Sequence, residues 1–160
     1  MREELERTKQ AIGDNILLNN FCMKRATVVI TDASGDGFAF ILLQYSDNGY
    51  IVIQVGSAAI KKLWRNYSAL ELEGTCVIWT LESLKFYLRG LHRFELWSDH
   101  APLKDAMAKQ LRELSPRLQR FREAVEGYGM VLKHDRGATN LAADSMSRPR
   151  WAALTRWRRC

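Results

Sequence analysis

The chain has 160 residues, 47% hydrophobic and 10% aromatic, so it can bury one core and is most simply a single domain with short tails. Its net charge of +6 is uneven, because residues 1–100 hold 11 Lys and Arg against 12 Asp and Glu, whereas residues 101–160 hold 13 against 6. The basic second half indicates a polyanionic partner such as nucleic acid, although a solvated charged face would give the same composition.

The cysteines are three in number, far apart and without CxxC spacing, which favours a reducing compartment and argues against a zinc site. No apolar run approaches the roughly 18 residues of a membrane helix, and no signal-like segment opens the chain. We therefore expect neither a membrane span nor Sec-type export.

Residues 26–34 predict a strand that is buried on both faces, because they are rich in Val, Ile and Thr and lead into a Gly-Asp-Gly turn. Asp32 lies near the end of this strand. An ionised carboxylate there needs a cation, hydrogen bonds or a shifted pKa. Residues 38–44 and 50–55 flank a Ser-Asp-Asn-Gly turn signal and predict a hairpin, so three antiparallel strands open the fold.

A helix is predicted next, because Ser68 and Glu71 form a capping-box pattern and Gly90 ends the helical stretch at about Arg89. At 100° per residue, Glu73 shares the apolar face of this helix, whereas Glu71 lies roughly 200° away on the polar side. Glu71 therefore has a local structural role, and Glu73 points towards the core.

The remaining elements alternate between strand and helix. Residues 93–99 predict a strand that ends at Asp99, and a helical piece with Pro102 in its first turn follows. Ser115 and Pro116 open a further helix that runs to Gly127. Residues 129–134 predict the last strand.

A short final helix is expected after Asn140, its N-cap, and before Pro149, which stops it. Asp144 would lie one turn into this helix and face the sheet. The whole pattern predicts an α/β fold.

Four acidic residues stand out in this pattern: Asp32, Glu73, Asp99 and Asp144. Each alone has a structural alternative, since a strand-end Asp often caps a turn and Asp144 could pair with Arg148. Four carboxylates in one cleft would repel one another, and hard divalent cations with oxygen ligands are the usual remedy.

Five motifs, taken in order, resemble the ribonuclease H domain of gypsy-class LTR retrotransposon reverse transcriptases. They are Thr-Asp-Ala-Ser at 31–34, Asn-Tyr-Ser at 66–68 before Glu-x-Glu, Tyr-Leu-Arg-Gly at 87–90, Ser-Asp-His-Ala-Pro-Leu at 98–103, and the segment 137–148. The resemblance implies a mixed five-stranded sheet of order 3-2-1-4-5 with helices on both faces. It also implies a lead-in at 1–25 from the connection segment, a ribonuclease H domain at 26–148 and a basic linker at 149–160.

The family's acidic set falls on Asp32, Glu73, Asp99 and Asp144, and for Glu73 it agrees with the helix-face argument. The resemblance implies two Mg²⁺ ions, replaceable by Mn²⁺, with Asp32 bridging both, Asp144 on the nucleophile side and Glu73 and Asp99 on the other. One departure is Gly74 inside the helix, which costs about 1 kcal/mol relative to Ala.

His134 lies ten residues before Asp144, a spacing that resembles retroviral and cellular ribonucleases H, whereas gypsy-class elements commonly carry tyrosine there. It is a candidate to shuttle protons or help release product. The alternative is a strand-end histidine that replaces the packing of tyrosine.

The implied activity is hydrolysis of the RNA strand of an RNA/DNA hybrid during reverse transcription, within a polyprotein that also carries the polymerase and its connection segment. Cytoplasmic virus-like particles are the expected location. Expected nucleic-acid contacts are Ser34, Gly35, Arg117, Arg120, Arg122, Arg136 and Asn140, although surface arginines often only face water. Two alternatives stay open, a non-catalytic nucleic-acid-binding or spacer domain of the same fold and a nuclease of this fold that acts on DNA.

Overall fold

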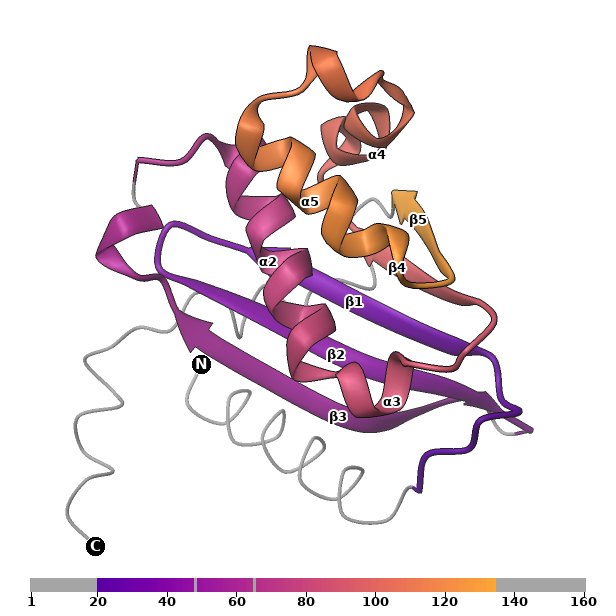
Figure 1. Ribbon diagram of the computed structural model, residues 1–160. Coiled ribbons are helices and arrows are strands. Elements are labelled where there is room, and N and C mark those ends of the chain that lie inside the picture. Colours follow the sequence, from indigo (N-terminus) through magenta and orange to yellow (C-terminus); the bar gives the residue numbers. More distant parts are fainter. Residues whose placement is uncertain (1–19, 48, 65, 135–160) are drawn as a thin grey trace, which may run out of the picture.

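A five-stranded mixed sheet forms the centre of the protein (Figure 1). The structure is a computed structural model that describes residues 20–47, 49–64 and 66–134. The strands lie in the order β3-β2-β1-β4-β5, which confirms the predicted fold class. Their bounds are Thr27–Ala33 for β1, Gly37–Ser46 for β2, Gly49–Ala59 for β3, Phe94–Ser98 for β4 and Met130–His134 for β5.

The central strand is β1, which pairs antiparallel with β2 on one side and parallel with β4 on the other. Every residue from Thr27 to Asp32 is buried, as the sequence predicts for a strand covered on both faces. Because β1 and β4 run in parallel, their carboxyl ends meet at the same edge of the sheet. Asp32 and Asp99 both belong to this edge.

The hairpin of β2 and β3 is confirmed but longer than predicted. Its turn is closed by Gly49, which has a φ of +107°, and by the Ser46 hydroxyl, which donates to the Gly49 carbonyl at 2.9 Å. The strand was predicted to end at residue 55, because the apolar pattern is interrupted by Gly and Ser in the last part of β3. Cross-strand pairing extends β3 to Ala59, opposite Gly37.

The long helix predicted after Ser68 is divided into α2 (Ala69–Ser83) and α3 (Lys85–Leu88). Its start is confirmed, because the Ser68 side chain accepts the Glu71 N–H and the Glu71 side chain accepts the Ser68 N–H. Leu84, with φ of −101° and ψ of 9°, interrupts the helix. Its side chain is fully buried in the core, a tertiary contact that no Gly or Pro announces in the sequence.

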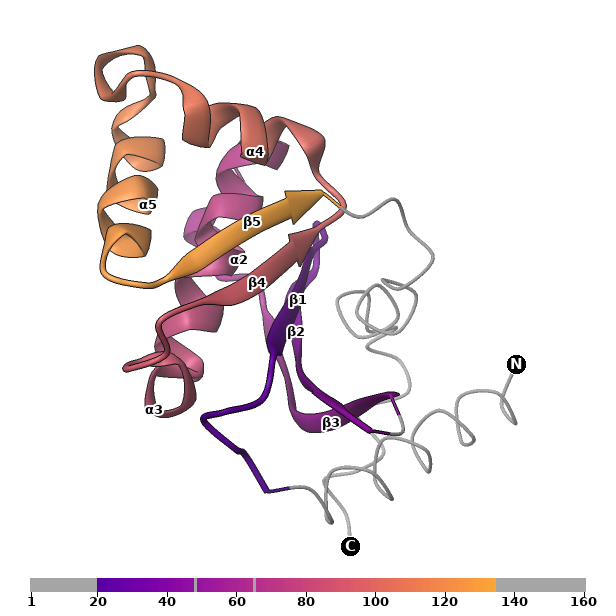
Figure 2. The ribbon, with the colours of Figure 1, turned by 90° about the vertical axis from the view of Figure 1, so that its right-hand side faces the viewer.

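All described helices cover one face of the sheet, and the helices that the resemblance implied on the other face are not among the described residues (Figure 2). The helix α4 (Ala101–Ala108) has Pro102 in its first turn as predicted, although no side chain caps it. The helix α5 (Pro116–Glu126) begins after its Ser115 cap and ends before Gly127, as predicted. Short 3₁₀ turns occupy Lys62–Trp64 and Leu111–Glu113. The main core joins these helices to the sheet through residues that include Val29, Leu42, Leu96, Val77, Leu103 and Phe121. The final helix expected after Asn140 lies outside the described residues. No helix in the described part of the chain is long and apolar enough to cross a membrane.

Two glycines differ in the room that a side chain would have. A Cβ on Gly74 of α2 would lie 3.4 Å from Cγ of Phe121, so this glycine lies where α5 packs on α2. A Cβ on Gly129 would lie 2.2 Å from the His92 carbonyl oxygen, which leaves no room for any side chain.

We predict that Gly74→Ala stabilises the protein by about 0.5–1 kcal/mol, because alanine favours the helix and its methyl group would make ordinary contacts with Phe121. Chemical denaturation of both proteins measures this difference. Gly129→Ala is the matched control and should be strongly destabilising. A loss of stability in Gly74→Ala would mean that α5 cannot yield even slightly to a methyl group.

Candidate functional site

Asp32 stands at the carboxyl end of β1 and is only 4% exposed. Its main chain is held by β2, where Ala39 is its partner, and by the Cys76 thiol of α2, which donates to the Asp32 carbonyl at 3.3 Å. The sequence analysis did not identify this thiol contact. The central strand and α2 thus fix Asp32 together.

Glu73 lies in the second turn of α2 with its side chain directed inward, and it is 5% exposed. The Ser98 hydroxyl lies 3.5 Å from Oε2 of Glu73 and donates to it, and the Ala33 backbone N–H also hydrogen bonds to this carboxylate. Glu73 therefore contacts the ends of both β1 and β4. The predicted inward orientation of Glu73 is confirmed by these contacts.

Asp99 directly follows β4 and is exposed, unlike the other two carboxylates. The residue before it, Ser98, is buried, and its Oγ accepts the N–H of His100 at 3.2 Å. The carbonyl oxygen of Asp99 lies 3.0 Å from Nε2 of His134 at the end of β5. Ser98 joins Glu73 to the corner that carries Asp99, a role that its place in the Ser-Asp-His motif does not reveal.

The pKa of Glu73 is raised to about 8, first by burial of the carboxylate and then by the negative charges of Asp99 and Asp32. The hydrogen bonds from Ala33 and Ser98 act in the opposite direction. Asp32 and Asp99 are therefore close enough to Glu73 for repulsion among the three carboxylates to change its ionisation. This is the electrostatic situation that a bound cation relieves.

The donor set fits a hard divalent cation, because three carboxylates from β1, α2 and the end of β4 repel one another around a largely buried position. Among the residues that the structure describes, no three His, Cys, Asp or Glu side chains are gathered tightly enough to form a metal cluster by themselves. Asp144, the fourth predicted ligand, lies outside the described residues.

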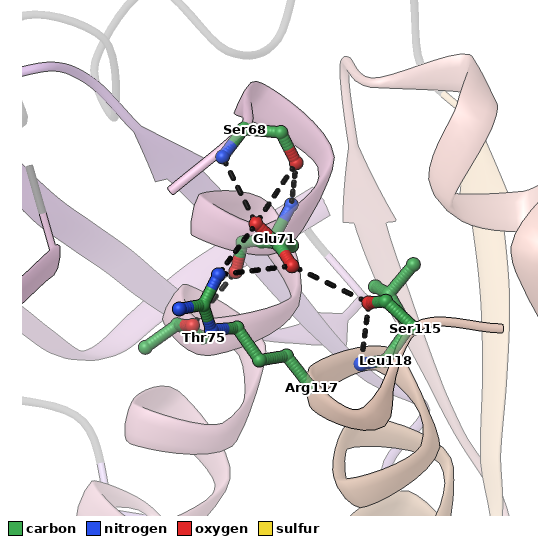
Figure 3. A network of polar contacts seen from close by, with 6 residues as sticks. All are labelled: Ser68, Glu71, Thr75, Ser115, Arg117 and Leu118. Atoms are coloured by element: carbon green, nitrogen blue, oxygen red, sulfur yellow. Dashed lines mark hydrogen bonds and ion pairs between the residues drawn. The ribbon is translucent and has the colours of Figure 1, made fainter. Parts of the chain in front are cut away.

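Glu71, two positions from Glu73, is the centre of a separate polar network (Figure 3). Its carboxylate accepts the Ser68 N–H at 3.1 Å, the Ser115 hydroxyl at 3.3 Å and the Arg117 guanidinium at 3.2 Å. One side chain thus caps α2 and links it to the start of α5. The structural role predicted for Glu71 is confirmed, and the link to α5 is an addition that local pattern could not predict.

The pKa of Glu71 is lowered, chiefly by the Ser68 backbone hydrogen bond and further by Arg117, whereas partial burial acts in the opposite direction. The pKa values of Glu71 and Glu73 are therefore shifted in opposite directions, although the two residues are only two positions apart.

The predicted nucleic-acid contacts have different surroundings. Arg117 lies over the Tyr67 ring at 4.1 Å and pairs with Glu71, and the Arg122 guanidinium donates to the Lys109 carbonyl. Arg120 is exposed, and Gly35 lies in an open turn that the Ser34 hydroxyl organises by accepting the Gly37 N–H at 3.1 Å. Arg136 and Asn140 lie outside the described residues, and these contacts stay predictions.

The order of the strands and the carboxylates at one sheet edge define an RNase H-like domain. The family model described as "RNase H-like domain found in reverse transcriptase" matches residues 22–128. The chain belongs to this family. The match confirms the resemblance to reverse transcriptase ribonuclease H domains that the motifs indicated.

The chain has relatives among the Pol polyproteins of Drosophila melanogaster transposons. The chain is 30% identical over 127 residues to the retrovirus-related Pol polyprotein from transposon opus, and 25% identical over 154 residues to that from transposon gypsy. These alignments cover 79% and 96% of this chain but only 12% and 14% of the polyproteins. They confirm the predicted relationship to gypsy-class elements.

Solved structures share the fold at low sequence identity. The foamy viral protease-reverse transcriptase in complex with RNA/DNA hybrid matches with a TM-score of 0.57 at 18% identity, over 74% of this chain and 16% of that one. The N-terminal RNase H domain of rv2228c from Mycobacterium tuberculosis matches with a TM-score of 0.54 at 14% identity, over 76% of this chain and 95% of that one. Both likenesses support the fold.

We predict that Glu71→Gln lowers the free energy of unfolding by about 1 kcal/mol at pH 7. The substitution removes the negative charge that pairs with Arg117 and that strengthens the hydrogen bonds from Ser68 and Ser115 at the starts of α2 and α5. The contribution of Glu71 is present above its unfolded pKa near 4.5 and is lost as the pH falls through its lower folded pKa. Denaturation at pH 7 and pH 3.5 measures it. Glu82→Gln, on the exposed side of α2, is the control and should change little; equal losses in both variants would contradict the prediction.

We also predict that metal-free protein becomes less stable as the pH rises from about 4.5 to about 8. In this window folded Glu73 keeps a proton that the unfolded chain has released, so the unfolded state is favoured as the pH rises. Glu73→Gln should flatten this dependence and be more stable than wild type at pH 8, by on the order of a few kcal/mol, since a pKa difference of one corresponds to about 1.4 kcal/mol. Denaturation in EDTA across this range provides the measurement. Parallel curves for the two proteins would show that the Glu73 carboxyl is not perturbed.

Proposed function

We propose that this domain is a metal-dependent endonuclease that hydrolyses the RNA strand of RNA/DNA hybrids. The observation that carries the proposal is geometric: Asp32 and Asp99 lie at the ends of the adjacent strands β1 and β4, and Glu73 is buried against these strand ends, in a domain of the reverse transcriptase RNase H-like family. Perturbed carboxyls that gather at one edge of a sheet are typical of catalytic sites.

Asp32, Glu73 and Asp99, with Asp144, would hold two divalent cations, Mg²⁺ or Mn²⁺. When bound, such ions supply an activated water and stabilise the leaving oxygen of the phosphodiester. Asp32 would contribute its carboxylate from the central, buried strand of the sheet, and Asp99 would present its exposed carboxylate towards solvent. Glu73 would lose its proton in favour of the cations, since a nearby positive charge lowers a carboxyl pKa.

The substrate would reach the same edge through its sugar-phosphate backbone. The turn at Ser34 and Gly35 lies beside Asp32 and offers backbone groups without bulky side chains. Arg120 is exposed and is the strongest candidate for a phosphate contact, whereas Arg117 and Arg122 are already bonded within the domain. Recognition would depend on 2′-hydroxyls and backbone shape rather than on base sequence.

The surroundings of the domain are part of the same proposal. The chain spans 12–14% of the Pol polyproteins that it matches, so the polymerase and connection segment would be its partners within one polyprotein. A hybrid substrate accords with the similar foamy viral protease-reverse transcriptase, which was solved in complex with RNA/DNA hybrid. Removal of genomic RNA in cytoplasmic virus-like particles would be the resulting role.

We predict that the protein cleaves a labelled RNA/DNA hybrid in the presence of Mg²⁺, and that Asp32→Asn, Glu73→Gln and Asp99→Asn each lower the rate by more than about 100-fold, the scale on which lost electrostatic stabilisation acts. Glu82→Gln and Glu71→Gln are the matched controls and should keep the activity, because glutamine at position 71 retains a side-chain oxygen that can accept the Ser68 N–H and preserve the helix cap. Full activity in Asp32→Asn and Asp99→Asn would refute the assignment.

Two further readouts separate the alternatives. Mg²⁺ should raise the melting temperature of wild type but not of Asp32→Asn, because a cation that binds only the folded state stabilises it. A spacer domain would bind hybrid without cleavage and without this Mg²⁺ effect. Cleavage of duplex DNA with the hybrid left intact would instead indicate a DNA nuclease of this fold.

A further inference from the structure

His134 is the last residue of β5 and pairs in register with Ser98, the last residue of β4. Its side chain extends one residue beyond this pair, because Nε2 lies 3.0 Å from the carbonyl oxygen of Asp99. The imidazole therefore continues the hydrogen bonding between the two strands past the point where the backbone pairing ends. It contacts the main chain of the residue that carries the exposed carboxylate of the site.

This contact determines where the proton of the imidazole lies. A backbone carbonyl can only accept a hydrogen bond, so Nε2 must donate and must carry a hydrogen. In the neutral ring the other nitrogen, Nδ1, is then bare. The geometry thus selects the Nε2–H tautomer.

The corner at Asp99 is held from its other side by Ser98. The buried Ser98 hydroxyl lies between Oε2 of Glu73 at 3.5 Å and the His100 N–H at 3.2 Å. Asp99 is therefore fixed through its carbonyl by β5 and through its neighbours by α2. Removal of the His134 donor would leave the carbonyl side of this corner unsupported.

We propose that His134 is a positioning residue, which orients Asp99 through the Nε2–H hydrogen bond rather than by carrying a proton in the reaction. The inference rests on the proposed nuclease function and deepens it. It selects neither alternative from the sequence analysis, since the ring acts neither as a proton shuttle nor only as packing in place of tyrosine.

Three variants distinguish positioning from proton transfer. Glutamine places an N–H near Nε2 of histidine, asparagine places one near Nδ1, and alanine has none. His134→Gln should keep kcat within about threefold of wild type. His134→Asn and His134→Ala should lose up to about tenfold in kcat with little change in KM, the effect of one lost hydrogen bond.

A proton carrier would give another pattern, because general acid-base catalysis contributes about 10²–10⁴-fold. All three variants would then lose at least about 100-fold, and glutamine would not rescue. That result, or equal rates in Gln, Asn and Ala, would overturn the proposal.

A second measurement does not depend on activity. Long-range ¹H–¹⁵N correlation spectra of the metal-free wild type at pH 8 report which imidazole nitrogen of His134 carries the hydrogen. We expect the Nε2–H form, and an Nδ1–H form would overturn the proposal. If the wild type cleaved no hybrid, the proposed function would fail, and these spectra would still test the His134 contact by itself.

Discussion

The parallel pairing of β1 with β4 is the constraint on which the rest of the site depends. Val28, Val29 and Ile30 align with Glu95, Leu96 and Trp97, so the two strands end together and deliver Asp32 and Asp99 to one edge. An antiparallel neighbour would have placed the second aspartate at the opposite edge. The helix α2 then crosses this edge from one face and brings Glu73 into contact with the ends of both strands. The parallel pairing of β1 with β4 and the packing of α2 on the sheet thus bring the three carboxylates together.

The same arrangement places the buried carboxyl of Glu73 close to the negative charges of Asp32 and Asp99. The core beneath the site is complete, with Val77, Leu81 and Leu96 buried, so Glu73 cannot move away into solvent without disturbing α2. The protonated form of the Glu73 carboxyl is favoured instead, because burial and the nearby negative charges raise its pKa. Local stability is therefore lower at this edge of the sheet than a neutral side chain at position 73 would give, and such local departures from the most stable sequence are common at functional sites.

Local signals in the sequence predicted most of the helices and strands, whereas the order of the strands was implied by the resemblance to a known family. The Val and Ile run at β1, the capping box at Ser68 and the Ser115-Pro116 start of α5 each depend on neighbours a few residues away. The break at Leu84, the length of β3 and the Ser98 bridge depend instead on partners distant in the chain, so no periodicity announced them. The positions of the three carboxylates were predicted through helix phase for Glu73 and through strand ends for the two aspartates, whereas their role in catalysis stays a proposal. Asp144 was predicted by the same reasoning and lies outside the described residues.

The two glutamates of α2 show how one turn of helix can serve opposite purposes. Glu71 accepts hydrogen bonds from Ser68, Ser115 and Arg117, so its charge is satisfied and its pKa falls. Glu73 is buried between like charges, so its pKa rises. The first residue anchors α2 and the start of α5, and this anchor holds the second in its unfavourable place. A rotation of α2 by two residues would exchange the two environments, leaving the helix uncapped and the strand ends without their third carboxylate. The capping box therefore sets the helix phase on which the proposed chemistry depends.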